Sequence, residues 1–295
     1  MERAVIIVNP ESRNSRRFKE HRQEILRILE SRFDLYIWET VKPGDGKRLA
    51  EKAIDFGASV VISAGGDGTL NEVANACAGR GVRVGILPLG ITNVFALSQK
   101  IPVNVVKAAE IIVKGYEKTV DLGLVNGERY FHMMLGAGID GFTIKEMPHE
   151  FKKAFGAPAH VMLALIKYPE YDPEPIYVEI DGQDYGIGYE VIISNIPNYG
   201  GKMKMAPNAD PSDGVFDVVI FRESGFVKDI SHWLGFLMGV HHRIGSVDIA
   251  KGRYVKLLGR NTYYHIDSEF GGRLPVNVEC VPRVLKIIVP APVAK

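Results

Sequence analysis

Short apolar runs alternate with amphipathic stretches over the first 120 residues of the chain. Ala4–Val8 predicts a buried strand, and Leu35–Trp38, Val60–Ser63 and Val82–Leu87 predict three more. A helix is expected after the first strand because apolar residues recur there at helical spacing, at Phe18, Ile25, Ile28, Leu29 and Phe33. Strands that alternate with helices form a parallel sheet covered on both faces. Residues 1–120 are therefore expected to be a Rossmann-like α/β domain.

Helix boundaries in this region are marked by capping residues. One helix is predicted to stop at Gly57, and the next to begin near Thr69. Asn104 is expected to cap a further helix, which ends at Gly115. These signals place a helix between each pair of predicted strands.

Beyond residue 120 the pattern changes to hairpins. Asn126-Gly127 and Asp181-Gly182 each lie between strand-like runs, as type I′ turns do. Further β-rich runs are Val191–Ser194, Val215–Phe221, Tyr254–Leu258, Tyr263–Ile266, Val276–Cys280 and Val284–Val289. This pattern predicts a C-terminal β-sandwich domain over 121–295, with the last strand free to return to the first domain.

Two helical stretches interrupt the β-rich half, Phe151–Tyr168 and Phe226–His242. The second contains Trp233 and many aliphatic residues, which we expect to be core. The alternative is contact with a membrane, in which Lys228, His241, His242 and Arg243 would face lipid headgroups. The adjacent His241 and His242 are expected at a surface.

Charge and cysteine content exclude several classes of protein. Thirty-six Lys and Arg balance thirty-five Asp and Glu, so no overall field favours nucleic acid. Cys77 and Cys280 are too few for a disulfide framework and point to a reducing, cytoplasmic environment. No apolar run reaches the roughly 18 residues of a spanning helix. We expect a protein that is neither secreted nor membrane-spanning.

The strongest chemical signal is the glycine-rich segment Ser63–Glu72, which follows a predicted strand and leads into a helix. Its glycines allow close approach of a ligand, and the N–H groups of a helix start attract phosphate. Asp67 would repel phosphate unless it binds Mg²⁺ or a hydroxyl. The alternative is an ordinary tight turn with Thr69 as N-cap.

Other polar turns follow the remaining strands of the predicted sheet. Asn9–Arg13 follows the first strand, Thr40 the second and Leu87–Asn93 the fourth. All would lie at the carboxyl edge, where open α/β sheets bind ligands. Together they predict a composite nucleotide site.

The chain resembles the diacylglycerol kinase catalytic-domain family, which includes bacterial lipid kinases and sphingosine kinases and is related to NAD kinases and phosphofructokinases. The resemblance covers nearly the whole chain. It rests on Gly65–Val73, Asp121-Leu122-Gly123, Gly136–Asp140, Asn198–Gly201, Ala206–Ala209, Asp213–Val218 and Asp267-Ser268-Glu269.

The resemblance implies transfer of the γ-phosphoryl group of ATP to a lipid hydroxyl, with a diacylglycerol-like acceptor, Mg²⁺ and a place in phospholipid metabolism. Glu269 would be the general base, with Asp67 as its rival, and Asp121 would orient the hydroxyl or the metal. The residues expected to bind the nucleotide are Asn9, Pro10, Ser12, Arg13, Thr40, Gly65, Gly66, Asp67, Gly68, Thr69, Asn71, Glu72, Thr92 and Asn93.

A structural Mg²⁺ is implied by the same resemblance, with Asp210, Asp213 and the carbonyl of Val215 as ligands. The alternative for this segment is a simple Asx turn.

Four positions depart from the family pattern. Ile91 stands where Thr is usual, and Thr92 is the candidate to supply the missing hydroxyl. Arg13, Lys202 and Ser268 stand where glycine is common.

Two rival functions stay open at this point. One is an NAD-kinase-like or other kinase with a soluble acceptor, and the other is a catalytically inactive nucleotide- or lipid-binding protein. The expected partners are a lipid substrate and, transiently, a membrane surface. The identity of the lipid and a homo-oligomeric state are left open.

Overall fold

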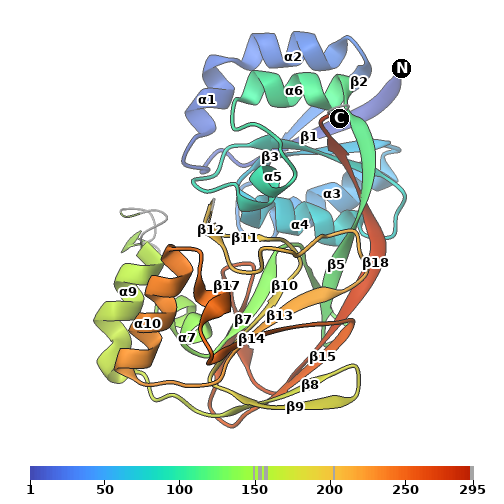
Figure 1. Ribbon diagram of the computed structural model, residues 1–295. Coiled ribbons are helices and arrows are strands. Elements are labelled where there is room, and N and C mark those ends of the chain that lie inside the picture. The colour runs from blue at the N-terminus through green and yellow to red at the C-terminus, as the bar shows by residue number, and fades with distance from the viewer. Residues whose placement is uncertain (149, 152–154, 156–158, 202, 293–295) are drawn as a thin grey trace. The chain divides into compact units, whose positions relative to one another are not determined.

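The computed structural model describes the chain except residues 149, 152–154, 156–158, 202 and 293–295 (Figure 1). Two compact units make up the chain. The first unit is Met1–Val120 with Arg283–Lys295, and the second unit is Asp121–Pro282. Two strands, β5 (Tyr116–Val125) and β18 (Val276–Val289), begin in one unit and end in the other.

A parallel sheet forms the centre of the first unit. Its strands are β1 (Glu2–Val8), β2 (Phe33–Glu39), β3 (Val60–Gly65) and β4 (Arg83–Pro88), in the order β2-β1-β3-β4. The end of β18 adds a further parallel strand beside β4. Chain order reverses at β1, which lies between β2 and β3. This switch point is where open α/β sheets bind ligands.

Helices cover both faces of this sheet, as the sequence predicts. They are α1 (Ser15–Glu20), α2 (Arg22–Glu30), α3 (Asp45–Asp55), α4 (Asp67–Cys77), α5 (Val94–Ser98) and α6 (Val105–Lys114). In Figure 1, α2 and α6 pack together on one side of the sheet, and α3 and α4 on the other. The α/β class is thereby confirmed.

Some boundaries in the first unit differ from those predicted. The first helix is interrupted at His21, and Phe33 begins β2 instead of ending that helix. The N-cap of α4 is Gly66, so the alternative in which Thr69 is the N-cap of this helix is wrong. Asn104 does cap α6, since its side chain accepts hydrogen bonds from Val106 and Lys107 N–H.

The second unit is a β-sandwich, also as predicted. One sheet has the order β14-β13-β10-β7-β16-β17. The other contains β18, β15, β8 and β9, with β5 and β6 beside them. The bounds are β6 (Arg129–Phe131), β7 (Met134–Ala137), β8 (Ile176–Ile180), β9 (Gln183–Gly188), β10 (Glu190–Ser194), β13 (Phe216–Phe221), β14 (Val247–Gly252), β15 (Tyr254–Leu258), β16 (Tyr263–Ile266) and β17 (Glu269–Arg273). A short ribbon pairs β11 (Asn198–Tyr199) with β12 (Met203–Lys204).

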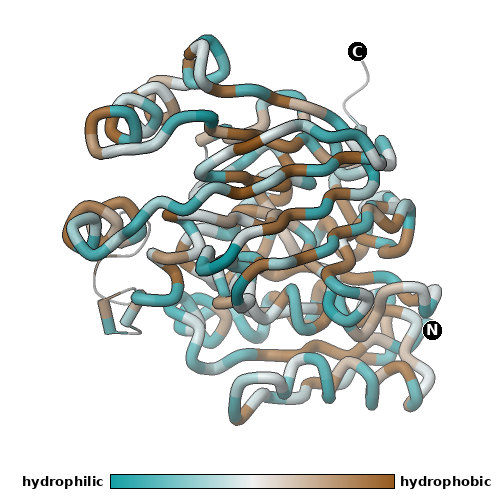
Figure 2. The backbone as a smooth tube through the Cα atoms, turned by 90° about the horizontal axis from the view of Figure 1, so that it is seen from below, coloured by the Kyte–Doolittle hydropathy of each residue, from teal (hydrophilic) through white to brown (hydrophobic). Residues whose placement is uncertain are grey.

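Alternation of buried and exposed positions builds the sandwich core. Strand β8 alternates buried and exposed residues from Ile176 to Ile180, and β15 does the same. Figure 2 shows this alternation as changes of colour along the strands. Phe131 and Phe216 stack at the centre of the core, with ring centroids 5.5 Å apart. Burial of aromatic pairs of this size is a main source of stability in sandwiches.

Both predicted hairpin turns are confirmed. Asn126 and Asp181 have φ of 51° and 50°, and the following glycines have φ of 74° and 77°. Two positive φ angles in succession are the mark of the type I′ turn. The two C-terminal β-runs, however, are one strand, β18, and not two.

Helices α7 (Ile139–Lys145), α9 (Ala159–Lys167) and α10 (Phe226–Leu237) lie together beside the sandwich (Figure 1). The short helices η1 (Tyr168–Glu170) and η2 (His241–Arg243) follow α9 and α10. Part of the helix predicted over Phe151–Tyr168 lies outside the described residues. Among the described helices, none is long and apolar enough to cross a membrane.

Two burial predictions in this region are wrong. His241 is fully buried and its Nε2 lies 2.8 Å from the carbonyl oxygen of Met205, whereas His242 is exposed. The α10 stretch is only partly core, because Phe236 is buried but Leu234, Leu237 and Met238 are at least half exposed. Helix α10 therefore presents an apolar face to solvent.

Candidate active site

Side-chain hydrogen bonds join the turns that follow β1, β3 and β4. Asn9 donates from Nδ2 to the hydroxyl of Thr69 at 3.1 Å. Asn14 and Asn93 both donate from Nδ2 to the carbonyl of Gly90, at 2.6 and 3.1 Å. The structure thus brings the predicted residues of these turns together at one edge of the parallel sheet. Asn14, on the turn after β1, was not among the residues predicted to form the site.

Asp67 fixes the turn after β3 to the start of helix α5. Its carboxylate accepts the N–H groups of Val94 at 3.0 Å and Phe95 at 3.2 Å. It also accepts the hydroxyl of Thr92 at 3.3 Å, so Thr92 supplies a hydroxyl next to the position where the family has Thr and this chain has Ile91. A carboxylate can accept about four hydrogen bonds, so three leave capacity for one further ligand.

Close packing of two glycines brings these turns into contact. A Cβ on Gly66 would lie 3.1 Å from Cα of Gly90, and a Cβ on Gly90 would lie 2.6 Å from Cα of Gly66. A Cβ on Gly65 would lie 2.5 Å from the side chain of Thr69. Gly65, Gly66 and Gly90 therefore pack too closely for a side chain to be added without a shift of the turns. The lack of side chains at these positions also leaves the backbone accessible to a ligand.

The first turn of α4 offers backbone donors at this edge. Gly66 is the N-cap, and the N–H groups of the first turn have no acceptor within a helix. Gly66, Asp67 and Gly68 are partly exposed, whereas Asn71 is buried. Such a helix start binds the oxygens of a phosphate through N–H groups and the helix dipole.

Two carboxylates hold the turn after β2, where Thr40 was predicted to contact nucleotide. Glu72 accepts the N–H groups of Gly44 at 2.8 Å and Gly46 at 2.7 Å. Asp45 accepts those of Val41 and Lys42 at 2.9 and 3.2 Å. These bonds, with Arg48, lower the pKa of Asp45, so the carboxylate is charged at neutral pH and this anchoring fails only below the usual carboxyl range. Glu72 thus has a structural partner, and Asp45 was missed.

In the second unit, Asp121 and the segment 210–215 are brought together. Asp121 is fully buried on β5, and its Oδ2 accepts the N–H of Gly214 at 2.7 Å. Its own N–H donates to the carbonyl of Pro211 at 2.7 Å. Asp121 therefore orders the turn that was predicted to bind a metal.

The predicted metal ligands already have partners. Asp210 accepts the N–H of Ser212 and Asp213 that of Val215, which are Asx-turn bonds. The ammonium of Lys251 lies 2.8 Å from Asp213 and 3.3 Å from Asp217. No group of three or more His, Cys, Asp or Glu placed to hold a metal occurs among the residues that the structure describes. Lysine supplies the positive charge at this turn.

Glu269 follows a tight turn between β16 and β17. Asp267 and Ser268 have φ of 49° and 64°, so Ser268 adopts the left-handed conformation that glycine favours. The buried carboxylate of Asp267 accepts the N–H groups of Met133 and Met134, each at 3.0 Å. Glu269 itself is exposed, and its carboxylate forms an ion pair with Arg129. Arg129 gave no signal in the sequence.

A buried polar cluster lies beside this turn. Asp140, on α7, is 2.8 Å from Nε2 of His265, 2.6 Å from Nε2 of His160 and 2.7 Å from the hydroxyl of Tyr199. Burial alone would raise the pKa of Asp140, but the two histidines outweigh it and hold that pKa well below its usual range. Asp140 and Tyr199 occur in motifs shared with the family, but no role was predicted for them, and the histidines have no distinctive spacing.

Comparison with known proteins decides the family. The diacylglycerol kinase catalytic domain matches residues 3–125, and the YegS C-terminal NAD kinase beta sandwich-like domain matches residues 134–289. The chain belongs to the diacylglycerol kinase catalytic-domain family. It is an ATP-dependent lipid kinase, and the comparisons favour neither of the two rival functions.

Named relatives match over almost their whole length. A diacylglycerol kinase of Bacillus subtilis (strain 168) is 29% identical over 296 residues, which cover 98% of this chain and 97% of the relative. A diacylglycerol kinase of Staphylococcus aureus (strain MRSA252) is 27% identical over 297 residues, which cover 98% of this chain and 92% of the relative. The kinase therefore shares both of its units with these relatives.

Solved structures confirm the fold. A crystal structure of a diacylglycerol kinase from Bacillus anthracis str. Sterne has a TM-score of 0.76 at 21% identity, covering 99% of this chain and 98% of the other. A second structure from the same organism has a TM-score of 0.84 at 23% identity, covering 99% and 97%.

The close contact between Gly66 and Gly90 predicts that a side chain at position 90 will disturb this edge of the sheet. Gly90→Ala places a methyl group against the backbone of Gly66, so the two turns must separate and the edge predicted to bind nucleotide must distort. We expect a loss of ATP affinity of about tenfold or more, because losing one hydrogen bond to a charged phosphate costs about 1.5–3 kcal/mol and about 1.4 kcal/mol is tenfold in Kd. Isothermal titration with a non-hydrolysable ATP analogue measures it. The matched control is Gly245→Ala, whose Cβ meets no atom within 4 Å; equal affinities in both variants would contradict the prediction.

Proposed function

We propose that this lipid kinase transfers the γ-phosphoryl group of ATP to the free hydroxyl of a diacylglycerol-like lipid. The observation that carries the proposal is the match to named diacylglycerol kinases over 98% of this chain. The helix start at Gly66, surrounded by the polar turns after β1, β2 and β4, supports it. These turns offer the backbone and side-chain donors that a triphosphate requires.

The roles proposed in the first unit follow from these turns. The amides of Gly66, Asp67, Gly68 and Thr69 would bind phosphate oxygens. Asn9, Pro10, Ser12 and Arg13 after β1, and Thr40 after β2, would border the nucleotide. Arg13 is exposed and carries a guanidinium that suits a phosphate. Thr92, Asn93, Asn71 and Glu72 would act mainly by holding the turns in place.

Glu269 is proposed as the general base. In this step the lipid hydroxyl gives its proton to the Glu269 carboxylate, and its oxygen forms a bond to the γ-phosphorus. The bond from that phosphorus to the β–γ bridging oxygen breaks, and ADP leaves with the electron pair. The ion pair with Arg129 holds the Glu269 carboxylate in one orientation until an acceptor binds. Asp121 would act indirectly, by ordering the turn at 210–215.

Replacing Glu269 by Gln tests this assignment. The amide keeps the size of the side chain but cannot take the proton, so turnover should fall by about 10² to 10⁴ with ATP affinity unchanged. The assay follows phosphorus from labelled ATP into phosphatidic acid in diacylglycerol vesicles. Asp67→Asn is the companion variant, because it removes the charge and keeps an acceptor for Phe95 N–H.

Three outcomes separate the proposals. Near-normal turnover in Glu269→Gln together with severe loss in Asp67→Asn would transfer the role of base to Asp67. Label in a water-soluble product would replace the lipid acceptor by a soluble one. Normal nucleotide binding with no labelled product from the wild-type protein would contradict the proposed reaction.

Mg²⁺ is proposed as the companion of ATP, where it would neutralise charge that develops on the phosphates. The residues fit such an ion near Asp67, whose carboxylate has capacity for one more ligand. They fit less well at 210–215, because Lys251 already neutralises Asp213. A Mg²⁺ with Asp210, Asp213 and the Val215 carbonyl as ligands would have to displace that ammonium.

This competition gives a prediction for the 210–215 turn. Lys251→Met removes the competing ammonium, so the variant should gain more thermal stability from Mg²⁺ than the wild-type protein does. A cation that binds only the folded state adds about 2.7 kcal/mol at a hundredfold excess over its Kd. Thermal scans without nucleotide, with and without Mg²⁺, measure the difference, and Lys251→Met/Asp213→Asn is the control. An equal response in all three proteins would leave the segment as an Asx turn held by lysine.

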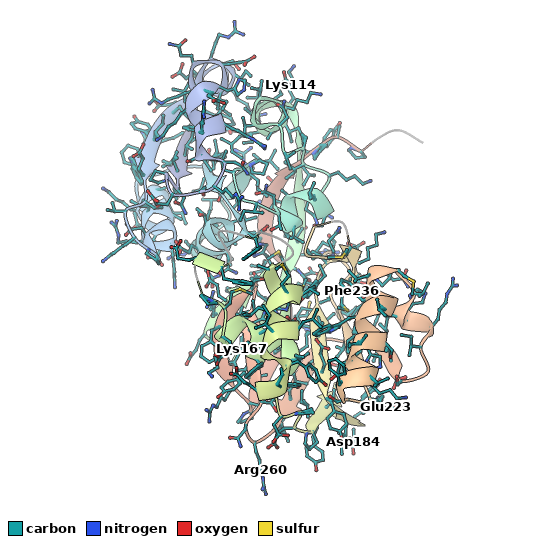
Figure 3. All side chains as sticks on the ribbon, turned by 90° about the vertical axis from the view of Figure 1, so that its left-hand side faces the viewer. Lys114, Lys167, Asp184, Glu223, Phe236 and Arg260 are labelled. Atoms are coloured by element: carbon teal, nitrogen blue, oxygen red, sulfur yellow. The ribbon has the colours of Figure 1, made fainter. Side chains whose placement is uncertain are left out.

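Transient contact with a membrane is the last part of the proposal. It is supported by exposed apolar residues on helices of the second unit. Exposed apolar residues lie on two neighbouring helices, Met162, Leu165 and Ile166 on α9 and Phe226, Val227, Leu234 and Leu237 on α10, and Met238 directly follows α10. Figure 3 labels Lys167 at the end of α9 and the buried Phe236 on α10. Apolar helix faces flanked by Lys and Arg bind lipid surfaces.

Vesicle sedimentation tests this surface. Leu234→Ser/Met238→Ser removes two half-exposed apolar side chains, so partitioning to anionic vesicles should fall about tenfold or more, since each buried CH₂ contributes about 0.8 kcal/mol. The control is Leu258→Ser, an exposed leucine on β15. Equal binding by the double variant and the control would remove α10 from the membrane contact.

A further inference from the structure

The imidazole of His265 has both ring nitrogens in use. Its Nε2 lies 2.8 Å from Oδ2 of Asp140, and its Nδ1 lies 3.2 Å from the backbone nitrogen of Ser268. The ring is 1% exposed at the end of β16. It therefore connects a buried carboxylate on α7 to the residue that immediately precedes Glu269.

These two contacts determine which nitrogen carries the proton. A backbone N–H can only donate, so Nδ1 of His265 must be the acceptor for Ser268. The other nitrogen, Nε2, then carries the hydrogen and donates it to Oδ2 of Asp140. Asp140 thus fixes the one tautomer of His265 that can hold the Ser268 N–H.

The backbone leaves space for this contact. Gly136 of β7 is paired with His265 of β16. A Cβ on Gly136 would lie 2.5 Å from Oδ2 of Asp140 and 2.6 Å from Nε2 of His265. Any larger residue at position 136 would separate the carboxylate of Asp140 from the imidazole of His265. Glycine is therefore needed here for their hydrogen bond.

The turn that is held in this way carries a strained residue. Ser268 has φ of 64°, a conformation that costs free energy for a residue with a Cβ. Asp267 is anchored through its carboxylate, whereas Glu269 is exposed. The hydrogen bond from the Ser268 N–H to His265 therefore holds the backbone between Asp267, which is anchored, and Glu269, the proposed base.

We propose that His265, oriented by Asp140, is a positioning residue for phosphoryl transfer, because its Nδ1 holds the Ser268 N–H and so sets the direction of the Glu269 carboxylate. The proposal rests on the assignment of Glu269 as general base. It adds two residues, His265 and Asp140, that act through Glu269 and do not touch the phosphate.

Two substitutions at His265 separate its two contacts. Gln places an amide nitrogen near the position of Nε2, so His265→Gln keeps the donor to Asp140 and loses the acceptor for Ser268. Asn places an oxygen near the position of Nδ1, so His265→Asn keeps that acceptor and loses the contact with Asp140. We expect kcat to fall about 10- to 100-fold in His265→Gln and less than about threefold in His265→Asn, with KM for ATP unchanged in both.

The matched control is His232→Gln. His232 is another buried histidine of the second unit. Its Nε2 lies 2.8 Å from the hydroxyl of Ser246 and its Nδ1 has no hydrogen-bond partner among the described residues, so neither nitrogen holds the turn. This variant should keep wild-type kcat. Gly136→Ala leaves every side chain of the pair intact and should lower kcat by separating Asp140 from His265.

A double variant provides the readout that a merely structural role would not give. If His265 acts through Glu269, His265→Gln/Glu269→Gln should be no slower than Glu269→Gln alone. Equal losses in His265→Gln and His265→Asn, or additive losses in the double variant, would overturn the proposal. If His265→Gln does not fold, wild-type kcat in Gly136→Ala overturns it.

Failure of the underlying assignment has a different signature. Wild-type turnover in Glu269→Gln would remove the general base and the positioning role with it. Loss in Glu269→Gln together with wild-type kcat in His265→Gln would keep the base and reject only the positioning role.

Discussion

Carboxylate oxygens that accept backbone N–H groups hold the turns of this kinase in place. Asp67 fixes the start of α5, and Glu72 fixes the start of α3. Asp121 fixes the turn at Gly214, and Asp267 fixes the chain at Met133. A hydrogen bond to an ionised acceptor is about twice as strong as a neutral one, and a buried N–H without an acceptor is costly. The same acids that suggest catalysis in the sequence are therefore also the anchors of the fold.

Anchored turns suit the chemistry of phosphoryl transfer. The protein does little covalent chemistry in such reactions, so its contribution is to hold donors and a base in position. Turns held by their own carboxylates do not have to be ordered when the nucleotide binds, which lowers the entropic cost of binding. A consequence is that removing one of these acids changes both the fold and the activity, and only substitutions that keep a hydrogen-bond acceptor can separate the two effects.

Local patterns in the sequence were sufficient for most of the architecture. Asn104, Asn126-Gly127 and Asp181-Gly182 act through neighbours in the chain, so their roles could be predicted from sequence alone. Phe33 was placed in a helix because its spacing suits one, but pairing with β1 makes it the first residue of β2. Tertiary pairing overrides local periodicity in such cases. The ion pair of Arg129 with Glu269 and the contact of Asp140 with His265 join residues more than 100 positions apart. Such contacts depend on the tertiary fold, so no local sequence pattern indicates them.

Hydrogen exchange in the nucleotide-free protein tests the central claim most directly. The N–H groups of Gly44 and Gly214 are informative because these residues are not buried and each N–H donates to a carboxylate, that of Glu72 or that of Asp121. The account predicts that both amides exchange much more slowly than those of an unstructured peptide, before any ligand is added. Exchange at the rate of an unstructured peptide, with protection appearing only when ATP binds, would show that the ligand orders these turns and would contradict the account.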